Sequence, residues 1–352
     1  MPRASTVLGV ARDQGQRERI ERCITVHETH NVRGRRLPAG PARSAEPLLL
    51  LTDGQCVVLA SLVECWQDHV WHASRVRVCE TGEMRHELRA TAADGTSIAW
   101  SRTGPTGEDN STVVLVHGIT ESAGSFDPVT ALLAESHDVI TMDLRGHGES
   151  GTATRYDLEV MTGDVIAVIA AARVNAPHLI GHSLGGAVVS AVGGVADVAS
   201  VVDIDQSLQL HGFKEMLSPA EPMLRDADQY RQVVDAMFDA MQGDLLPAAE
   251  RERINAGRRA DQDVILGIWD VILTQPVDEI SQTVEMALAG YANKHTPYLA
   301  LFGIDPGNGY GSWLSDRIEG AIIDVWTDHG HYPHLVEPQR FVDTVERFWS
   351  NI

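Results

Sequence analysis

The stretch PHLIGHSLGG, residues 177–186, joins a short apolar run to a run of small residues. The apolar run predicts a buried strand, and residues 184–195 predict the helix that follows it. The motif G-x-S-x-G is centred on Ser183, between the two elements. In a strand–turn–helix context this motif holds the serine hydroxyl on a sharp, exposed turn. The pattern predicts Ser183 as a nucleophile and the backbone N–H of Leu184 as a donor to an oxyanion.

Further apolar runs and helical patterns alternate on both sides of this motif. A hairpin is predicted at residues 86–92 and 97–101, because an Asp-Gly pair stands at its turn. Strands separated by helices are typical of a parallel sheet that is covered on both faces. We therefore expect an α/β fold with a mostly parallel, doubly wound sheet. The predicted strands are 112–117, 138–143, 177–181, 200–205, 297–302 and 321–326, and the predicted helices are 156–174, 184–195 and 341–349.

Residues 206–290 interrupt this alternation, because they contain helical patterns only. An apolar stripe with a spacing of three and four residues runs from Tyr230 to Met241. Residues 264–273 are apolar on nearly all sides, which predicts burial. We interpret 206–290 as a helical insertion and expect the core domain to consist of residues 84–205 and 291–352.

The first 83 residues differ from the rest of the chain in charge and in pattern. They carry 11 Arg, no Lys and 10 acidic residues, whereas the whole chain of 352 residues has a net charge of −21. They also contain all four cysteines, Cys23, Cys56, Cys65 and Cys79, without the spacing of a zinc site. We expect residues 1–83 to be a poorly ordered appendage, or else a wrongly assigned start that precedes a true start at Met84.

The composition excludes several classes of function. A net charge of −21 disfavours binding to nucleic acid. No apolar run reaches the roughly 18 residues that a membrane-spanning helix needs, and residues 1–20 lack the apolar region of a signal peptide. We therefore expect a cytoplasmic protein with a small-molecule substrate. The sequence contains no dinucleotide fingerprint and no cluster of metal ligands, so no cofactor and no metal are predicted, and it indicates no oligomeric state.

Two other strand ends carry groups that a nucleophilic serine requires. His117 and Gly118 end the strand at 112–117, and a tight turn there offers a second N–H, that of Ile119, to an oxyanion. The stretch HGHYPHL, residues 329–335, follows the last predicted strand. A histidine on that loop can act as the base for the serine. His331 is the preferred candidate, with His329 and His334 as rivals.

The histidine in turn needs a carboxylate that fixes its orientation. Asp305 stands just beyond the predicted strand at 297–302, which gives the chain order Ser, Asp, His. Asp205 ends the strand that directly follows the nucleophile helix, so it is the alternative. Asp203 lies deeper in the same strand and ranks last. The sequence favours Asp305 over Asp205.

These features together resemble the α/β-hydrolase fold superfamily from about residue 86 to residue 352. The motifs that carry the resemblance are HG at 117–118, DLRGHGES at 143–150, GHSLGG at 181–186 and GHYPHLVEP at 330–338. The resemblance implies Ser183 as nucleophile, His331 as base, Ile119 and Leu184 as oxyanion donors, and residues 206–290 as a cap. Related enzymes carry G-x-x-D after the seventh strand, whereas Asp305 follows Gly303 by only two positions. Some members take the acid from the end of the sixth strand, where Asp205 stands.

The nature of the nucleophile limits the reactions that such a site supports. Relatives that open epoxides or remove halide use an aspartate in place of Ser183, so a serine indicates acyl transfer to water. We expect a serine hydrolase that cleaves a small or medium apolar ester, lactone or related carbonyl compound through an acyl-enzyme. The alternatives are a cofactor-free perhydrolase of the haloperoxidase type, an acyltransferase with the same triad, and a receptor that binds a small molecule without catalysis.

Overall fold

The computed structural model describes residues 88–107 and 111–352, and of the earlier residues it gives only the backbone of short strands. The chain divides into two units, Met1–Glu87 and Leu88–Ile352. The predicted appendage and the proposed start at Met84 concern residues that lie outside the described part. The strands of the first unit are β1 (Leu8–Gly9), β2 (Leu48–Thr52), β3 (Gln55–Leu59), β4 (Leu62–Glu64), β5 (Trp71–Ala73), β6 (Val76–Val78) and β7 (Met84–His86).

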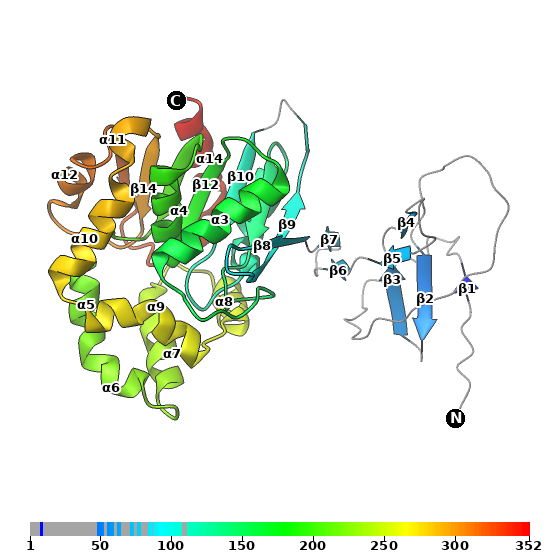
Figure 1. The fold of residues 1–352 in the computed structure, drawn as a ribbon, viewed down its shortest axis with the longest axis horizontal. Coiled ribbons are helices and arrows are strands. Elements are labelled where there is room, and N and C mark those ends of the chain that lie inside the picture. Colours follow the sequence, from blue (N-terminus) through cyan, green and yellow to red (C-terminus); the bar gives the residue numbers. More distant parts are fainter. Residues whose placement is uncertain are drawn as a thin grey trace. The chain divides into compact units, whose positions relative to one another are not determined.

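The second unit is built on an eight-stranded sheet (Figure 1). The strand order is β15-β14-β13-β12-β10-β11-β9-β8. Strand β9 is antiparallel to both of its neighbours, β8 and β11, and the six strands from β10 to β15 are mutually parallel, so the predicted α/β fold is confirmed. The strands are β8 (Leu88–Thr91), β9 (Ser97–Thr103), β10 (Thr112–Val116), β11 (Asp138–Met142), β12 (His178–His182), β13 (Ser200–Ile204), β14 (Tyr298–Phe302) and β15 (Ile322–Val325).

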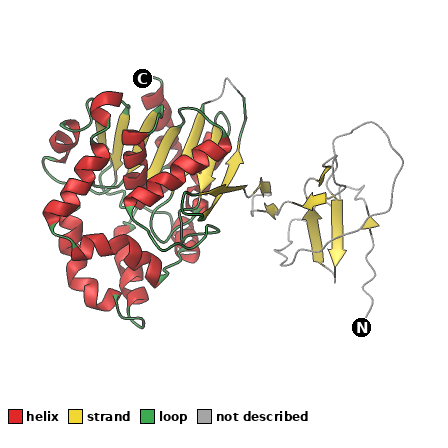
Figure 2. Cartoon of the chain, viewed as in Figure 1, coloured by secondary structure: helices red, strands yellow, loops and turns green. Residues whose placement is uncertain are grey.

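Helices cover both faces of this sheet (Figure 2). Alternate residues of a strand point to opposite faces, so Val114 and Val116 pack under one helix layer and Val113 and Leu115 under the other. The first layer contains α3 (Leu158–Ala172) and α4 (Leu184–Val195), and the second contains α2 (Asp127–Leu133) and α14 (Pro338–Trp349). No helix in the described part of the chain is long and apolar enough to cross a membrane.

Short helices complete the connections between the strands. The 3-10 helix η2 (Ala123–Phe126) precedes α2, and α12 (Tyr310–Ser315) lies between β14 and β15. The short α13 (Pro333–Val336) directly precedes α14.

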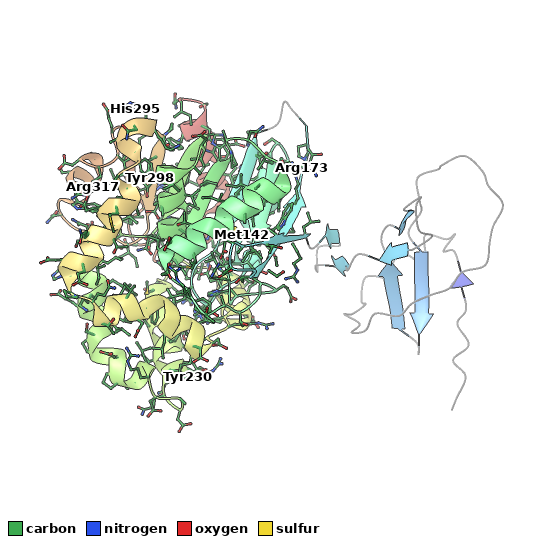
Figure 3. All side chains as sticks on the ribbon, viewed as in Figure 1. Met142, Arg173, Tyr230, His295, Tyr298 and Arg317 are labelled. Carbon is green, nitrogen blue, oxygen red and sulfur yellow. The ribbon has the colours of Figure 1, made fainter. Side chains whose placement is uncertain are left out.

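The helical segment expected at 206–290 lies between β13 and β14 and consists of two parts. Helix α10 (Val277–Leu288), and α11 (Tyr291–Lys294) just beyond the segment, pack on α4 within the core of the sheet layer. The helices before α10 are called the cap helices after their predicted role. Most of them share an apolar cluster with Ile119 and Tyr156, whereas Ile254 of α8 packs in a separate cluster with Tyr332. Figure 3 shows Tyr230 among the cap helices, well away from Tyr298 in the sheet layer. The cap helices are α5 (His211–Leu217), η3 (Ser218–Ala220), α6 (Glu221–Leu224), α7 (Tyr230–Met241), α8 (Ala248–Gly257) and α9 (Gln262–Thr274).

Helix boundaries in this unit follow local capping chemistry. The Asp157 side chain accepts a hydrogen bond from Val160 N–H at the start of α3, and Arg173 adopts the left-handed conformation at its end. At the start of α9 the Asp261 side chain accepts from the N–H groups of Asp263 and Val264. The two aspartate side chains satisfy N–H donors that have no partner within the helix.

A chain that begins at Met84 is expected to keep the thermal midpoint of the full chain. The sheet of the second unit takes its first strand at Leu88, and that strand pairs with β9 alone. Circular dichroism melts of the two chains test this expectation. A chain that begins at Ala93 lacks β8, whose Ala90 is buried, and should melt lower. Insolubility or a clearly lower midpoint of the Met84 chain would mean that the first 83 residues pack as part of the domain.

Candidate active site

Ser183 occupies the tight turn between β12 and α4. Its backbone has φ 52° and ψ −124°, a conformation that residues with a side chain rarely adopt. Such strained conformations occur mainly at functional sites. The Ser183 N–H donates to the carbonyl of Ile204 at 2.9 Å, which fixes the turn to the neighbouring strand. Gly185 must lack a side chain, because a Cβ there would lie 2.1 Å from the carbonyl oxygen of Val116. The motif therefore has the strand–turn–helix setting that its spacing predicts.

Among residues 118–121 of the loop after β10, one N–H group has no acceptor within the described part of the chain. The Gly118 N–H donates to Glu121 Oε2 at 3.2 Å, and the Thr120 N–H donates to His147 Nε2 at 3.2 Å. The Glu121 N–H donates to the carbonyl of Gly118 at 3.3 Å. That leaves the N–H of Ile119, which has no acceptor within the described residues. The loop is thus arranged to offer this one donor.

The same loop touches the nucleophile turn. A Cβ on Gly118 would lie 3.1 Å from the Cβ of Ser183, so the glycine permits close approach of the two backbones. Leu184 is the first residue of α4, and its N–H has no acceptor in the described part of the chain either. The two predicted oxyanion donors, Ile119 and Leu184, are therefore both unengaged and both adjoin Ser183.

His331 is paired with Asp205. Its Nδ1 lies 2.6 Å from Asp205 Oδ2, and both side chains are buried. The other carboxylate oxygen, Oδ1, accepts from the N–H of Gly303 at 2.7 Å and of Ile304 at 2.9 Å. The oxygen Oδ2 accepts the Nδ1–H of the imidazole. The other ring nitrogen, Nε2, is buried and has no hydrogen-bond partner among the described residues.

The structure contradicts the expectation that Asp305 would contact His331. Asp305 is exposed, and its Oδ1 accepts the N–H of Gly307 at 2.9 Å in a local turn. The loop after β14 directs the backbone N–H groups of Gly303 and Ile304, rather than the carboxylate of Asp305, toward Asp205. Asp203 is also excluded from this contact, because its carboxyl group accepts from the Tyr298 hydroxyl at 3.1 Å. Burial raises the pKa of Asp203 well above its usual range.

The two rival histidines have other surroundings. His329 bridges the Thr327 carbonyl at 3.0 Å and Glu337 Oε2 at 2.9 Å. His334 is fully buried, and its ring packs against Phe126 with 5.2 Å between ring centroids. Burial lowers the pKa of His334 well below the usual histidine range, so this ring is neutral. Neither ring contacts a carboxylate at the end of β13.

The His331 loop is held from two sides. The His331 N–H donates to the carbonyl of Met241 at 2.8 Å, at the end of cap helix α7. From below, His182 Nε2 donates to the carbonyl of His331 at 2.7 Å. Gly330 has φ 62°, and a Cβ there would meet the carbonyl oxygen of Gln242 at 2.5 Å. The position of the His331 backbone therefore depends on both the sheet and the cap helices.

We call residues 117–122 the oxyanion loop, after the role predicted for Ile119, and a buried ion pair lies beneath it. Glu121 contacts His182 Nδ1 at 3.3 Å while it accepts the Gly118 N–H. Burial disfavours charge on both side chains, but their mutual attraction outweighs it. The pKa of Glu121 consequently lies well below its usual range, and the pKa of His182 lies above its own. The pair fixes the start of the loop that presents Ile119.

The DLRGHGES stretch, residues 143–150, contacts the loop that carries Ile119. Arg145 is buried, and its guanidinium group donates to Asp164 at 2.6 and 2.7 Å and to Asp94 at 2.9 Å. His147 donates from Nδ1 to the Arg145 carbonyl at 2.9 Å, so its Nε2 can accept the Thr120 N–H. Burial lowers the pKa of His147 to about 4. His147 is thus a neutral acceptor that holds the oxyanion loop.

The stability of the fold is expected to fall as the pH drops from about 6.5 toward 4. Unfolded His147 binds a proton near pH 6.5, whereas the folded ring does so only near its pKa of about 4. Each proton that only the unfolded state binds costs about 1.4 kcal/mol per pH unit, so His147 accounts for roughly 3 kcal/mol over this window. Urea unfolding at several pH values measures this slope in the wild type and in His147→Gln.

His147→Gln should have a shallower slope, because the glutamine oxygen can still accept a hydrogen bond but does not titrate in this window. Burial lowers the pKa of His178 to about 4 as well, and that of His334 is also lowered, so both act in the same direction as His147. The raised pKa of His182 acts in the opposite direction. The comparison of the two proteins isolates His147, and equal slopes would contradict this account.

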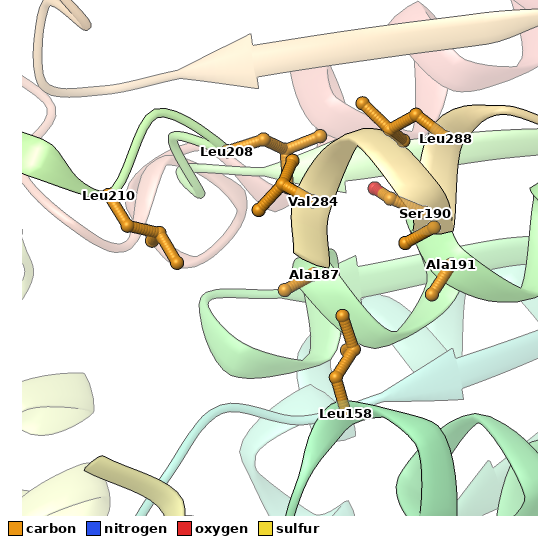
Figure 4. Close-up of a pocket in the computed structure, with 9 residues that line it drawn as sticks. Leu158, Ala187, Ser190, Ala191, Leu208, Leu210, Val284 and Leu288 are labelled. Carbon is orange, nitrogen blue, oxygen red and sulfur yellow. The ribbon is translucent and has the colours of Figure 1, made fainter. Parts of the chain in front are cut away.

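Two hollows lie near these elements. Figure 4 shows one between α3, α4 and α10, lined by apolar side chains and Ser190. Its volume of about 40 Å³ is too small for an ester, and it belongs to the core. The other, of about 200 Å³, lies between the oxyanion loop and α8, with Glu121, Arg253 and Gly257 in its wall.

In the described part of the chain, no group of His, Cys, Asp and Glu side chains is arranged to hold a metal ion.

Three features of the site were not expected from the sequence. Glu121 has no motif that distinguishes it from other acidic residues. His182 stands beside the nucleophile, but its role in holding the His331 loop depends on packing between distant segments. The bond from His331 to Met241 likewise joins parts of the chain that only the fold brings together.

Comparisons with known proteins agree with the α/β fold described above. The model of the alpha/beta hydrolase family matches residues 113–344. An uncharacterized protein of Mycobacterium tuberculosis is 27% identical over 266 residues, which are 67% of this chain and 74% of that protein. Esterase YbfF of Escherichia coli is 26% identical over 151 residues, 42% of this chain and 55% of the esterase. The crystal structure of the esterase RhEst1 from Rhodococcus sp. ECU1013 is 26% identical, with a TM-score of 0.56, over 75% of this chain and 98% of the esterase. The chain belongs to the alpha/beta hydrolase family.

Proposed function

We propose that this hydrolase cleaves a small or medium apolar ester, lactone or related carbonyl compound through an acyl-enzyme on Ser183. The observation that carries the proposal is the pairing of His331 with Asp205 at 2.6 Å. It leaves His331 Nε2 without a partner among the described residues, on a loop that is contacted by His182, the residue before Ser183. The esterases among the relatives support the reaction class.

The proton transfers follow from this pairing. His331 Nε2 takes the proton of the Ser183 hydroxyl as the serine oxygen attacks the substrate carbonyl. The Asp205 carboxylate stabilises the imidazolium that forms, and the N–H groups of Gly303 and Ile304 hold that carboxylate in place. His331 then gives the proton to the leaving alcohol, and it later activates the water that releases the acid.

The developing negative charge falls on the carbonyl oxygen of the substrate. The N–H groups of Ile119 and Leu184 are the donors that would receive it, because both are unengaged and both adjoin Ser183. Donors that are already fixed need no rearrangement during the reaction, and each is worth about 10²–10³ in rate. The Glu121–His182 pair and neutral His147 would keep the Ile119 donor in position.

The apolar character of the substrate is inferred from the cap helices. Their buried cluster includes Phe238, Val264 and Trp269, and it reaches Ile119 and the partly buried Leu184 at the site. An acyl chain bound there would contact apolar side chains, and about 25 cal/mol per Å² of buried apolar surface would favour it.

A screen of esters and lactones with different chain lengths tests the proposal. We expect hydrolysis of short and medium acyl esters by the wild type, with the Ser183→Ala protein as the blank. Addition of peroxide or of an alcohol in the same assay distinguishes hydrolysis from perhydrolysis or acyl transfer. No Ser183-dependent turnover of any ester or lactone would overturn the proposal.

A further inference from the structure

Arg258 is a buried cation that is only half satisfied. It follows directly after α8, and its side chain is 5% exposed. One guanidinium nitrogen, Nη1, lies 3.3 Å from Asp239 and 3.8 Å from Asp235. The other, Nη2, is buried and has no hydrogen-bond partner among the described residues. An unpaired donor on a buried charge is costly, so such a group is rare unless it serves a ligand.

Contacts with two loops place Arg258 near the predicted catalytic residues. The next residue, Arg259, donates its N–H to the Thr120 carbonyl at 2.8 Å, and Thr120 directly follows Ile119 in the oxyanion loop. On the other side lies Tyr332, the residue after His331. The pKa of the Tyr332 hydroxyl is raised by burial and by the charge of Glu121, while the charge of Arg258 and its contact with this hydroxyl oppose that rise. Arg258 therefore lies between the oxyanion loop and the His331 loop.

Two other buried polar atoms on the neighbouring loops also lack partners among the described residues. They are Thr120 Oγ1, whose residue lies on the loop that Arg259 contacts, and His331 Nε2, on the loop that precedes Tyr332. The lack of a partner for His331 Nε2 agrees with its proposed role toward Ser183 and the substrate.

The charge of the missing partner follows from the surroundings of Arg258. Its two acidic neighbours, Asp235 and Asp239, are 47% and 55% exposed, so solvent screens their charges. The ring of Phe238 lies 5.2 Å from the guanidinium carbon and offers no acceptor oxygen. A buried guanidinium nitrogen is best satisfied by an anionic oxygen, and a carboxylate fits its planar geometry.

We propose that Arg258 binds a carboxylate of the substrate, so the preferred substrates are esters or lactones that carry a carboxylate group. The proposal rests on the proposed function and narrows its substrate class. The apolar cap cluster then contacts the hydrocarbon part of the substrate, while Arg258 fixes the charged end. The chain as a whole carries a net charge of −21. It would repel such a substrate at long range, so the local cation is needed for its capture.

Two pairs of substrates test this proposal. The first pair places the charge in the acyl part: the mono-4-nitrophenyl ester of glutaric acid against 4-nitrophenyl pentanoate. The second pair places it in the leaving group: 4-carboxyphenyl acetate against 4-carbamoylphenyl acetate. For at least one pair, we expect kcat/KM of the wild type to favour the charged member by about tenfold or more, as a charge-assisted hydrogen bond would give.

Variants of Arg258 locate the source of this preference. Arg258→Gln should remove the preference, mainly through a higher KM for the charged member, and Arg258→Lys should retain part of it. Arg225→Gln is the matched control, because Arg225 is a cap arginine that is 41% exposed and pairs with Glu221 and Asp270. The control should leave the preference unchanged.

The outcomes separate this inference from the proposed function. Equal turnover of charged and neutral members, or an unchanged preference in Arg258→Gln, would overturn the role of Arg258 while hydrolysis by Ser183 stands. Absence of Ser183-dependent hydrolysis in every pair would instead overturn the proposed function. If Arg258→Gln fails to fold, inhibition of the wild type decides. Glutarate should then compete with the neutral ester at a concentration about tenfold lower than its diamide does, and equal inhibition would contradict the inference.

Discussion

Ser183→Ala is expected to lower kcat for ester hydrolysis by on the order of 10⁴-fold or more, with the fold intact. The loss is large because the serine oxygen forms the covalent bond, so His331 and the oxyanion donors have no nucleophile to assist. The fold should persist because alanine fits the turn at φ 52° with a smaller side chain and keeps the bond to the Ile204 carbonyl. Steady-state kinetics and a thermal melt of the same preparation measure both effects.

A matched change at a serine outside the site controls for general damage. Ser190 lies about two helix turns further along α4, where its hydroxyl contacts the Gly186 carbonyl and the Tyr298 hydroxyl at 2.7 Å. Ser190→Ala should lower stability more than catalysis. If Ser183→Ala kept most of its activity while folded, the mechanism would have to be abandoned.

Asp205→Asn is expected to lower kcat by about 10⁴-fold with little change in substrate binding. The amide can donate to His331 Nδ1 and so favours the wrong tautomer, in which Nε2 carries the proton and can no longer act as a base. The change also removes the negative charge that stabilises the imidazolium. Asp305→Asn should cost little, because Asp305 is exposed and contacts only its own turn.

Kinetics of the two single variants under the same conditions decide between the acids. The pH profile adds a second readout, since loss of the carboxylate should change the apparent pKa of kcat/KM, whereas Asp305→Asn should leave the profile as in the wild type. A larger loss in Asp305→Asn than in Asp205→Asn would place the acid after β14, against the observed contact.

The fold could be predicted well because its signals are local. Each parallel strand is a short apolar run, and the turn residues Ala93-Asp94-Gly95-Thr96 predict the hairpin. The predicted strand at 112–117 appears as β10 and the predicted helix at 184–195 as α4, with the ends shifted by one residue at most. Periodicity and turn chemistry decide such elements, and both can be read without tertiary structure.

The acid could not be decided in the same way. Both Asp205 and Asp305 stand at strand ends on the same edge of the sheet, and the choice depends on how the loop after β14 turns. Asp205 has φ 54°, a left-handed conformation that aspartate tolerates, and this turns its carboxylate toward His331. The short spacing from Gly303 to Asp305 was the one sequence signal against Asp305.

The residues that hold the site in place could not be predicted from the sequence, for a related reason. Glu121 and Arg258 are unremarkable in the sequence, and charged residues are usually exposed. Their importance comes from burial and from contacts with segments far along the chain, as in the bond between Arg259 and Thr120. Contacts of this kind depend on the packing of the cap helices, which periodicity does not specify.

Labelling with a fluorophosphonate, followed by peptide mass spectrometry, tests the central claim most directly. Such a reagent bonds to a serine only when a base and an oxyanion site activate it. We predict one label per chain, on the peptide that contains Ser183, with none in Ser183→Ala and strongly slowed labelling in Asp205→Asn. A folded protein that stays unlabelled would be a receptor rather than a serine hydrolase, and a label on any other residue would contradict the assignment of Ser183.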